Sequence, residues 1–93
     1  MRMANHVYII RSAADGTYYV GMTGDLAKRL VKHNSGATVY TRSCGPWVMV
    51  YTEEHPSRTA ALRRERQIKK RKSRYYLEEL IRSRSVDATA RAT

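Results

Sequence analysis

The chain has 93 residues, enough for one small domain and too few for two independent hydrophobic cores. Eighteen basic against eight acidic residues give a formal net charge of +10, which favours a polyanionic partner, nucleic acid ahead of an acidic membrane surface. No apolar run approaches the roughly 20 residues that span a bilayer, and no signal peptide is recognisable. The single cysteine, Cys44, excludes an intramolecular disulfide and a multi-cysteine zinc site. We therefore expect a cytoplasmic protein without membrane association.

The N-terminal segment predicts a β-hairpin followed by a helix. Runs of β-branched and aromatic residues over about 6–11 and 17–22 are typical of strands, and Asp15-Gly16 between them is a turn signal. Asp25 or Thr23 offers the N-cap of a helix whose apolar residues recur at helical spacing. The hairpin should therefore lead directly into an amphipathic helix.

The rest of the chain predicts one more strand and two more helices. The first helix should end near Ser35-Gly36, because glycine is the usual residue of a left-handed C-terminal cap. Residues 37–46 predict a loop, and the apolar run 47–52 predicts a third strand. Pro56-Ser57 marks the start of the second helix, and Ser73 is the expected cap of the third.

The apolar pattern stops near residue 83. We therefore expect a folded domain over 1–84 and a disordered C-terminal tail over 85–93. The element order ββαβαα predicts an α/β fold, a three-stranded sheet with helices packed on it. No obligate protein partner is indicated, so we expect a monomer or a weak homodimer.

Half of the 18 basic residues fall within residues 58–74, where the only acid is Glu65. A run of like charges is usually a solvated helix face, but such faces tend to alternate in sign, and this one does not. We therefore favour contacts to a phosphate backbone, which give affinity without sequence information. The expected contacts include Arg63, Arg66, Lys69 and Lys70.

Two further features of the predicted helices bear on chemistry. Arg29 and His33 are four residues apart on one stripe that borders the apolar face of the first helix. That pattern fits either a functional pair or an ordinary pair on a basic surface. Glu65 falls between apolar residues on the second helix, so its carboxylate must be paired or bound to a cation. It is either an ion pair with an arginine or a ligand for a hard cation such as Mg²⁺.

The hairpin supplies two tyrosines, Tyr8 and Tyr19. If its connecting loop has an even number of residues, both side chains point to the same face of the sheet, and an odd number separates them. Tyrosines on strands are ordinarily packing residues. Gly21 lies inside the second strand, which suggests a close approach to its backbone.

Together these residues resemble the GIY-YIG nuclease domain, closest to small stand-alone bacterial members of the UPF0213 type. The resemblance spans about residues 4–82 and rests on an ordered set of short motifs. They are Val7-Tyr8-Ile9, Tyr19-Val20-Gly21-Met22-Thr23-Gly24-Asp25-Leu26, Arg29, His33-Asn34, Tyr40-Thr41-Arg42 and Arg63-Arg64-Glu65. Each is unspecific by itself, whereas the whole set in this order and spacing is specific.

The resemblance implies an antiparallel sheet and hydrolysis of phosphodiester bonds with one divalent metal, Mg²⁺ or Mn²⁺ in its place. Tyr8 or Tyr19 would activate the attacking water, and the family leaves open which. Arg29 would contact the scissile phosphate, His33 would hydrogen-bond within the tyrosine cluster, and Glu65 would bind the metal. A tyrosine acts as a base only if its pKa of about 10 is lowered.

The remaining motif residues are expected at the substrate, namely Asn34, Thr41 and Arg42. The chain departs from the family pattern in lacking the glycine of the first motif, in carrying Met22 where some repair nucleases have lysine, and in lacking a later asparagine, for which Asn34 is a candidate substitute. The resemblance thus implies a DNA endonuclease of DNA repair or processing, and analogy with small stand-alone relatives implies a preference for single strands. The alternatives are a nucleic-acid-binding module with little activity and a protein that acts on RNA.

Overall fold

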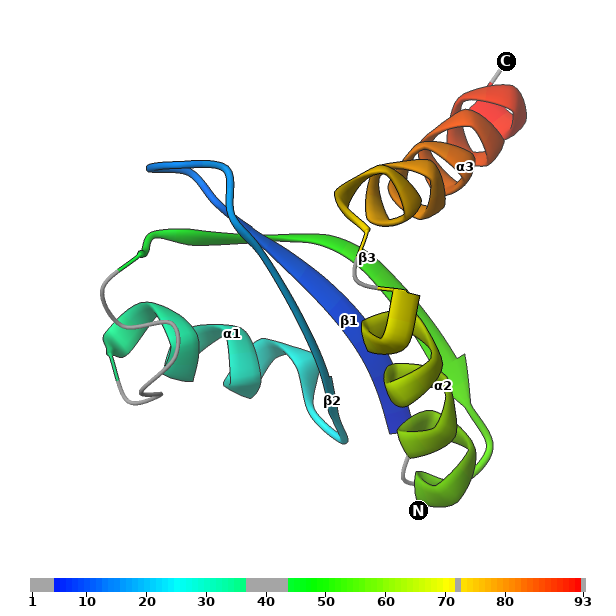
Figure 1. Ribbon diagram of the computed structural model, residues 1–93, viewed down its shortest axis with the longest axis horizontal. Coiled ribbons are helices and arrows are strands. Elements are labelled where there is room, and N and C mark those ends of the chain that lie inside the picture. The colour runs from blue at the N-terminus through cyan, green and yellow to red at the C-terminus, as the bar shows by residue number, and fades with distance from the viewer. Residues whose placement is uncertain (1–4, 37–43, 72, 93) are drawn as a thin grey trace.

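Three antiparallel strands form the sheet, with β1 in the middle and the order β2-β1-β3 (Figure 1). The strands are β1 (Asn5–Ser12), β2 (Tyr18–Thr23) and β3 (Trp47–His55). The computed structural model describes residues 5–36, 44–71 and 73–92, and of residues 84–92 only the backbone.

Helices cover both faces of this sheet, so the molecule has three layers. The helices are α1 (Leu26–Ser35), α2 (Arg58–Arg71) and α3 (Arg74–Ala92). α1 lies on one face, and α2 and the first turns of α3 lie on the other (Figure 1). The predicted order ββαβαα and the predicted α/β class are therefore confirmed.

The helix ends follow the capping residues that the sequence indicates. The Asp25 carboxylate accepts a hydrogen bond from the backbone N–H of Lys28 at 3.0 Å. Gly36 closes α1 with a φ of 83°, a conformation that glycine adopts without strain. The Ser73 hydroxyl caps α3 by accepting from the backbone N–H of Tyr76 at 3.1 Å. These caps fix where α1 leaves the hairpin and hence where its side chains lie.

Each face of the sheet has its own apolar cluster. The alternation of strand side chains sends Val7 and Ile9 to the α2 face, and Tyr8 and Ile10 to the α1 face. All four side chains are at most 1% exposed. β1 is therefore buried on both sides, which explains its unbroken run of large residues.

A β-bulge in β3 decides which of its residues face α2. Ile9 pairs with Tyr51 but Ile10 pairs with Met49, so Val50 is an extra residue in the ladder. Before the bulge Trp47 and Met49 face α1, and after it Tyr51 faces α2. The strand runs on to His55, three residues beyond the expected end, because it stays paired with β1.

The backbone of α3 is helical to Ala92, whereas the sequence predicted a disordered tail over 85–93. The apolar period does stop near residue 83, but the alanines that follow are strong helix formers and extend a helix that is already nucleated. The proposed division of the chain at residue 84 stays a prediction. In the part of the chain that the structure describes, no helix is long and apolar enough to cross a membrane.

Candidate active site

The two hairpin tyrosines lie on the same face of the sheet, the one covered by α1. The register pairs Tyr8 with Gly21 and Ile10 with Tyr19, so Tyr8 and Tyr19 are diagonal neighbours. Their ring centroids are 6.4 Å apart. The last pair of the register is Arg11 with Tyr18, so residues 12–17 connect the paired positions, an even number, which settles the parity that the sequence left open.

His33 of α1 packs against both tyrosines. Its Nε2 shares a hydrogen bond of 2.8 Å with the Tyr8 hydroxyl, and both side chains are 1% exposed. Its ring also meets that of Tyr19 edge-on, with centroids 5.0 Å apart. The stripe predicted on the first helix thus turns His33 inward onto the tyrosines.

Burial keeps this pair of residues uncharged. It raises the pKa of the Tyr8 phenol far above its ordinary value, with the Arg29 charge opposing the rise and Tyr19 and Glu65 adding to it. It also lowers the pKa of His33, and the Arg29 charge lowers it further. At neutral pH the site therefore holds a phenol and a neutral imidazole joined by a hydrogen bond.

Gly21 is the position where Tyr8 crosses the neighbouring strand. A Cβ atom there would lie 2.5 Å from the Tyr8 hydroxyl oxygen and 2.7 Å from its Cζ. Only glycine leaves that space empty. The close approach that the sequence suggested at Gly21 is thus made by the Tyr8 ring itself.

Arg29 lies one helical turn before His33 and is half-buried. Its Nε is buried without a hydrogen-bond partner among the residues that the structure describes. A buried donor left unpaired is rare in folded proteins, and on a guanidinium it favours an anionic partner such as a phosphate oxygen. Arg29 is thus placed to bind an anion beside Tyr8.

Glu65 joins the cluster from α2. Its side chain is 14% exposed, and Lys69 pairs with it at 3.1 Å. The ammonium of Lys69 in turn lies 5.8 Å from the ring centroid of Tyr19. The ion pair that the sequence allowed as an alternative therefore exists, but with a lysine on the same helix and not with an arginine.

The described residues contain no group of three or more histidine, cysteine or acidic side chains able to hold a metal ion. Glu65 alone can supply a carboxylate oxygen in the cluster. That donor fits Mg²⁺, which is often held through one or two carboxylates with water and substrate phosphates as its other ligands.

A hollow of about 440 Å³ adjoins Arg29 at the start of α1. Its lining is Thr23, Gly24, Asp25, Lys28, Arg29 and Lys32. The sequence analysis did not single out Lys28 and Lys32, although their spacing of four residues places them on one side of α1, one residue before Arg29 and His33. They extend the positive charge of the site away from the tyrosines.

Comparison with known proteins decides the family. The family model of the GIY-YIG catalytic domain matches residues 4–77, most of the chain. This protein belongs to the GIY-YIG family. It is 44% identical over 66 residues to a UPF0213 protein of Halobacterium salinarum, which covers 70% of this chain and 84% of the relative.

Other GIY-YIG relatives agree with this assignment. A UPF0213 protein of Bacillus pumilus is 37% identical over 84 residues, 86% of each chain. The solution NMR structure of a UPF0213 protein from Bacillus halodurans superposes with a TM-score of 0.53 at 40% identity, covering 85% of this chain and 83% of that one. The GIY-YIG fold and the resemblance that predicted it are confirmed.

Of the other predicted substrate residues, Lys69 borders the cluster beside Glu65 and Tyr19, and the rest are placed as follows. The Asn34 side chain accepts from the backbone N–H of Trp47 at 2.5 Å and donates to its carbonyl at 3.1 Å, so it anchors the start of β3. Thr41 and Arg42 lie outside the described residues. Arg63, Arg66, Lys69 and Lys70 are exposed on α2. Substrate contact by all of these residues stays a prediction.

A second polar cluster on the opposite face escaped the sequence analysis. Glu53 of β3 accepts hydrogen bonds from Arg64 at 2.9–3.0 Å and from the Tyr51 hydroxyl, and bonds His55 at 2.9 Å. Burial alone would raise the pKa of Glu53, but these bonds outweigh it and hold the pKa at about 2. Arg64, the middle residue of the Arg63-Arg64-Glu65 motif, is thus engaged with the sheet.

Proposed function

We propose that this GIY-YIG protein is a divalent-metal-dependent endonuclease that hydrolyses phosphodiester bonds in DNA. The observation that carries the proposal is the convergence of side chains from β1, β2, α1 and α2 on one place. There a neutral Tyr8–His33 pair, an arginine whose Nε has no partner among the described residues, and a largely buried carboxylate lie together. These are the groups that an in-line attack of water on a phosphodiester requires.

The hydrogen bond between Tyr8 and His33 provides the base. When His33 carries its own proton on Nδ1, its Nε2 accepts from the Tyr8 hydroxyl. The attacking water then gives its proton to the Tyr8 oxygen while the Tyr8 proton moves to Nε2, and the water oxygen bonds to phosphorus. The ester bond from phosphorus to the leaving oxygen breaks in the same displacement, and that oxygen takes a proton from solvent. The pKa of Tyr8 is raised, not lowered as a tyrosinate base requires, so we assign Tyr8 the role of a proton relay to His33, in which no free phenolate forms.

Arg29 and Glu65 act on the phosphate. As the water oxygen attacks, negative charge grows on the non-bridging oxygens, and the unpartnered Nε of Arg29 can donate to one of them. Glu65 would hold Mg²⁺, which supplies further stabilisation of that charge. Tyr19 and Lys69 border the same place, where they would position the DNA strand.

The proposal is tested by incubating labelled single-stranded DNA, duplex DNA and RNA with the full chain in Mg²⁺, Mn²⁺ or EDTA. We expect cleavage of DNA with either metal and none in EDTA. Glu65→Gln should abolish cleavage and leave DNA affinity equal or higher, because it removes a metal ligand and a negative charge.

Glu79→Gln is the matched control, because Glu79 also pairs with a basic residue, Arg82 at 2.8 Å, but lies on α3 away from the cluster. It should cleave like the wild type. Binding of all three nucleic acids without cleavage of any would support a binding module, and cleavage of RNA alone would support the RNA-directed role. Undiminished cleavage by Glu65→Gln would refute the metal assignment.

A further inference from the structure

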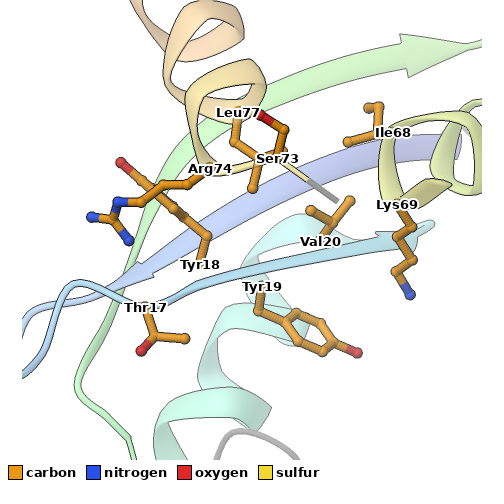
Figure 2. Close-up of a pocket in the computed structure, with 9 residues that line it drawn as sticks. All are labelled: Thr17, Tyr18, Tyr19, Val20, Ile68, Lys69, Ser73, Arg74 and Leu77. Atoms are coloured by element: carbon orange, nitrogen blue, oxygen red, sulfur yellow. The ribbon is translucent and has the colours of Figure 1, made fainter. Parts of the chain in front are cut away.

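A pocket of about 410 Å³ lies beside the candidate active site, between β2 and the junction of α2 and α3 (Figure 2). Its volume is within the range of small-molecule sites, roughly 300–1,000 Å³. β2 contributes one wall, and α2 and α3 contribute the other. The floor is apolar and consists of Val20, Ile68 and Leu77.

Two cations stand at the rim, each held in place by an acid on its own helix. Lys69 pairs with Glu65 at 3.1 Å, and Arg74 pairs with Glu78 at 3.1 Å. Arg74 also donates to the carbonyl of Gly16 at 3.1 Å. Both cationic side chains remain about half exposed, so each can still meet an anion from solvent.

Aromatic rings complete the walls. The Arg74 guanidinium lies 4.7 Å from the ring centroid of Tyr18, which is thereby fixed against the pocket. Tyr19 and Lys69 point together to the α1 side of β2, whereas Tyr18 and Val20 point to the other side (Figure 2). Because Tyr19 and Lys69 belong to the candidate active site as well, the pocket and that site are continuous around the edge of the sheet.

The pocket wall also has polar backbone. β2 is an outer strand, so its outward N–H and C=O groups have no strand partner among the described residues. Such groups match the donors and acceptors on the edge of a nucleobase. An apolar floor, the fixed ring of Tyr18 and two rim cations together match one nucleotide, with its base inside and its phosphates at the rim.

We propose that this pocket binds one unpaired nucleobase next to the bond that is cleaved, so that the substrate is a strand with an unstacked nucleotide. The inference rests on the proposed nuclease function for its biological meaning, but binding tests it independently. A base inside a continuous duplex cannot enter such a pocket without unstacking, which disfavours fully paired substrates.

The test uses fluorescence anisotropy of labelled DNA with the full chain in EDTA, so that no cleavage is needed. Three duplexes are compared: fully paired, with one unpaired thymidine, and with one unpaired abasic residue. The abasic duplex has the same phosphates and flexibility but no base. We expect the thymidine duplex to bind about 10-fold tighter than either of the others. Equal affinity for the thymidine and abasic duplexes would overturn the proposal.

Variants connect this preference to the pocket. Arg74→Ala and Tyr18→Leu should reduce it to within about threefold, because each removes part of a wall. Arg82→Ala is the matched control, since Arg82 is an exposed, ion-paired arginine on the same helix outside the pocket. It should keep the full preference. If both pocket variants, folded by circular dichroism, also keep it, the base binds elsewhere.

Cleavage in Mg²⁺ separates this inference from the proposed function. A preference for the unpaired thymidine without cleavage of any DNA would leave the pocket assigned and refute the nuclease. Cleavage without that preference would refute the pocket alone.

Discussion

Each face of the sheet carries a cluster of the same four residue types, but the two clusters differ in how their polar groups are hydrogen-bonded. The α1 face gathers a tyrosine, a histidine, an arginine and, from the sheet edge, a glutamate, and so does the α2 face. The first, which we call the open set, is Tyr8, His33, Arg29 and Glu65, and the second, the closed set, is Tyr51, His55, Arg64 and Glu53. In the second set the glutamate lies at the centre of the cluster and bonds all three partners. In the first, the Nε of the arginine has no partner in the part of the chain that the structure describes.

This contrast indicates that residue type alone does not make a catalytic site. The Arg64 guanidinium donates hydrogen bonds to both carboxylate oxygens of Glu53 and to the side-chain oxygen of Gln67. The bonds to Glu53 raise the pKa of Arg64. Arg29 has the same chemistry and an unused donor. Groups bonded to one another stabilise the fold, and groups that lack a partner can bind a substrate.

The largest expected effect is on catalysis by the open set. Arg29→Ala should lower single-turnover cleavage of a labelled oligonucleotide by about 10²–10³, the range found when one preorganised transition-state donor is removed. Arg29→Lys should restore only part of it, because an ammonium cannot reproduce the two-pronged guanidinium contact. The thermal midpoint should stay equal or rise. A folded Arg29→Ala protein that cleaves at the wild-type rate would remove the distinction between the two faces.

A change in the closed set should reduce stability and leave cleavage unchanged, the reverse of the result expected for Arg29→Ala. Glu53→Gln leaves Arg64 half-buried without its anion, so we expect a loss of roughly 3 kcal/mol in the free energy of unfolding. In a domain of this size that lowers the thermal midpoint by roughly 10–20 °C. Cleavage per folded molecule, measured well below the midpoint, should be unchanged. A slower but equally stable Glu53→Gln protein would instead make this cluster part of the site.

The same cluster predicts a pH dependence. The pKa of Glu53 is about 2 in the folded chain against 4.5 ordinarily, so between those values the unfolded chain binds a proton that the folded chain does not. The contribution of Glu53 is therefore complete above about pH 4.5 and is lost as the pH falls toward 2. Urea unfolding should show that the difference in free energy of unfolding between the wild type and Glu53→Gln decreases as the pH falls through that window. A gap that stays constant from pH 7 to pH 3 would contradict the assignment.

The sequence predicted more of the open set than of the closed one, for a physical reason. Helical spacing, a local periodicity, placed Arg29 and His33 on one stripe, and the resemblance to the GIY-YIG domain implied their roles and that of Tyr8. Glu53 reaches the α2 face only because the bulge at Val50 reverses the alternation in β3, and no local pattern announces a bulge. The register that joins the strands across the sheet was equally invisible, and the sequence left even the parity of the hairpin loop open.

The pairing of individual side chains was also out of reach. Asn34 was predicted at the substrate, yet both atoms of its amide are bonded to the backbone of Trp47, thirteen residues away. Gly21 shows what a local signal can achieve, since glycine in a strand predicted a close approach without naming its partner. The partner is Tyr8, from the neighbouring strand, and only the register reveals it.

The smallest expected effect concerns the hollow beside Arg29. Lys28 and Lys32 line it, and phosphates bound there would release counterions, so each contact should add about 0.7–0.9 to the log–log salt dependence of DNA binding. Removing both side-chain charges in Lys28→Gln/Lys32→Gln should therefore lower that slope by about 1.5 while folding stays intact. Arg82→Gln, which removes an exposed charge on α3, should leave the slope within error of the wild type. Because we expect the two lysines to contact only the DNA phosphate backbone, the affinity of the double variant should fall equally for every DNA sequence. Equal slopes for the wild type and the double variant would mean that the bound DNA does not pass over the hollow. The DNA-binding surface on this face of the sheet would then end at Arg29.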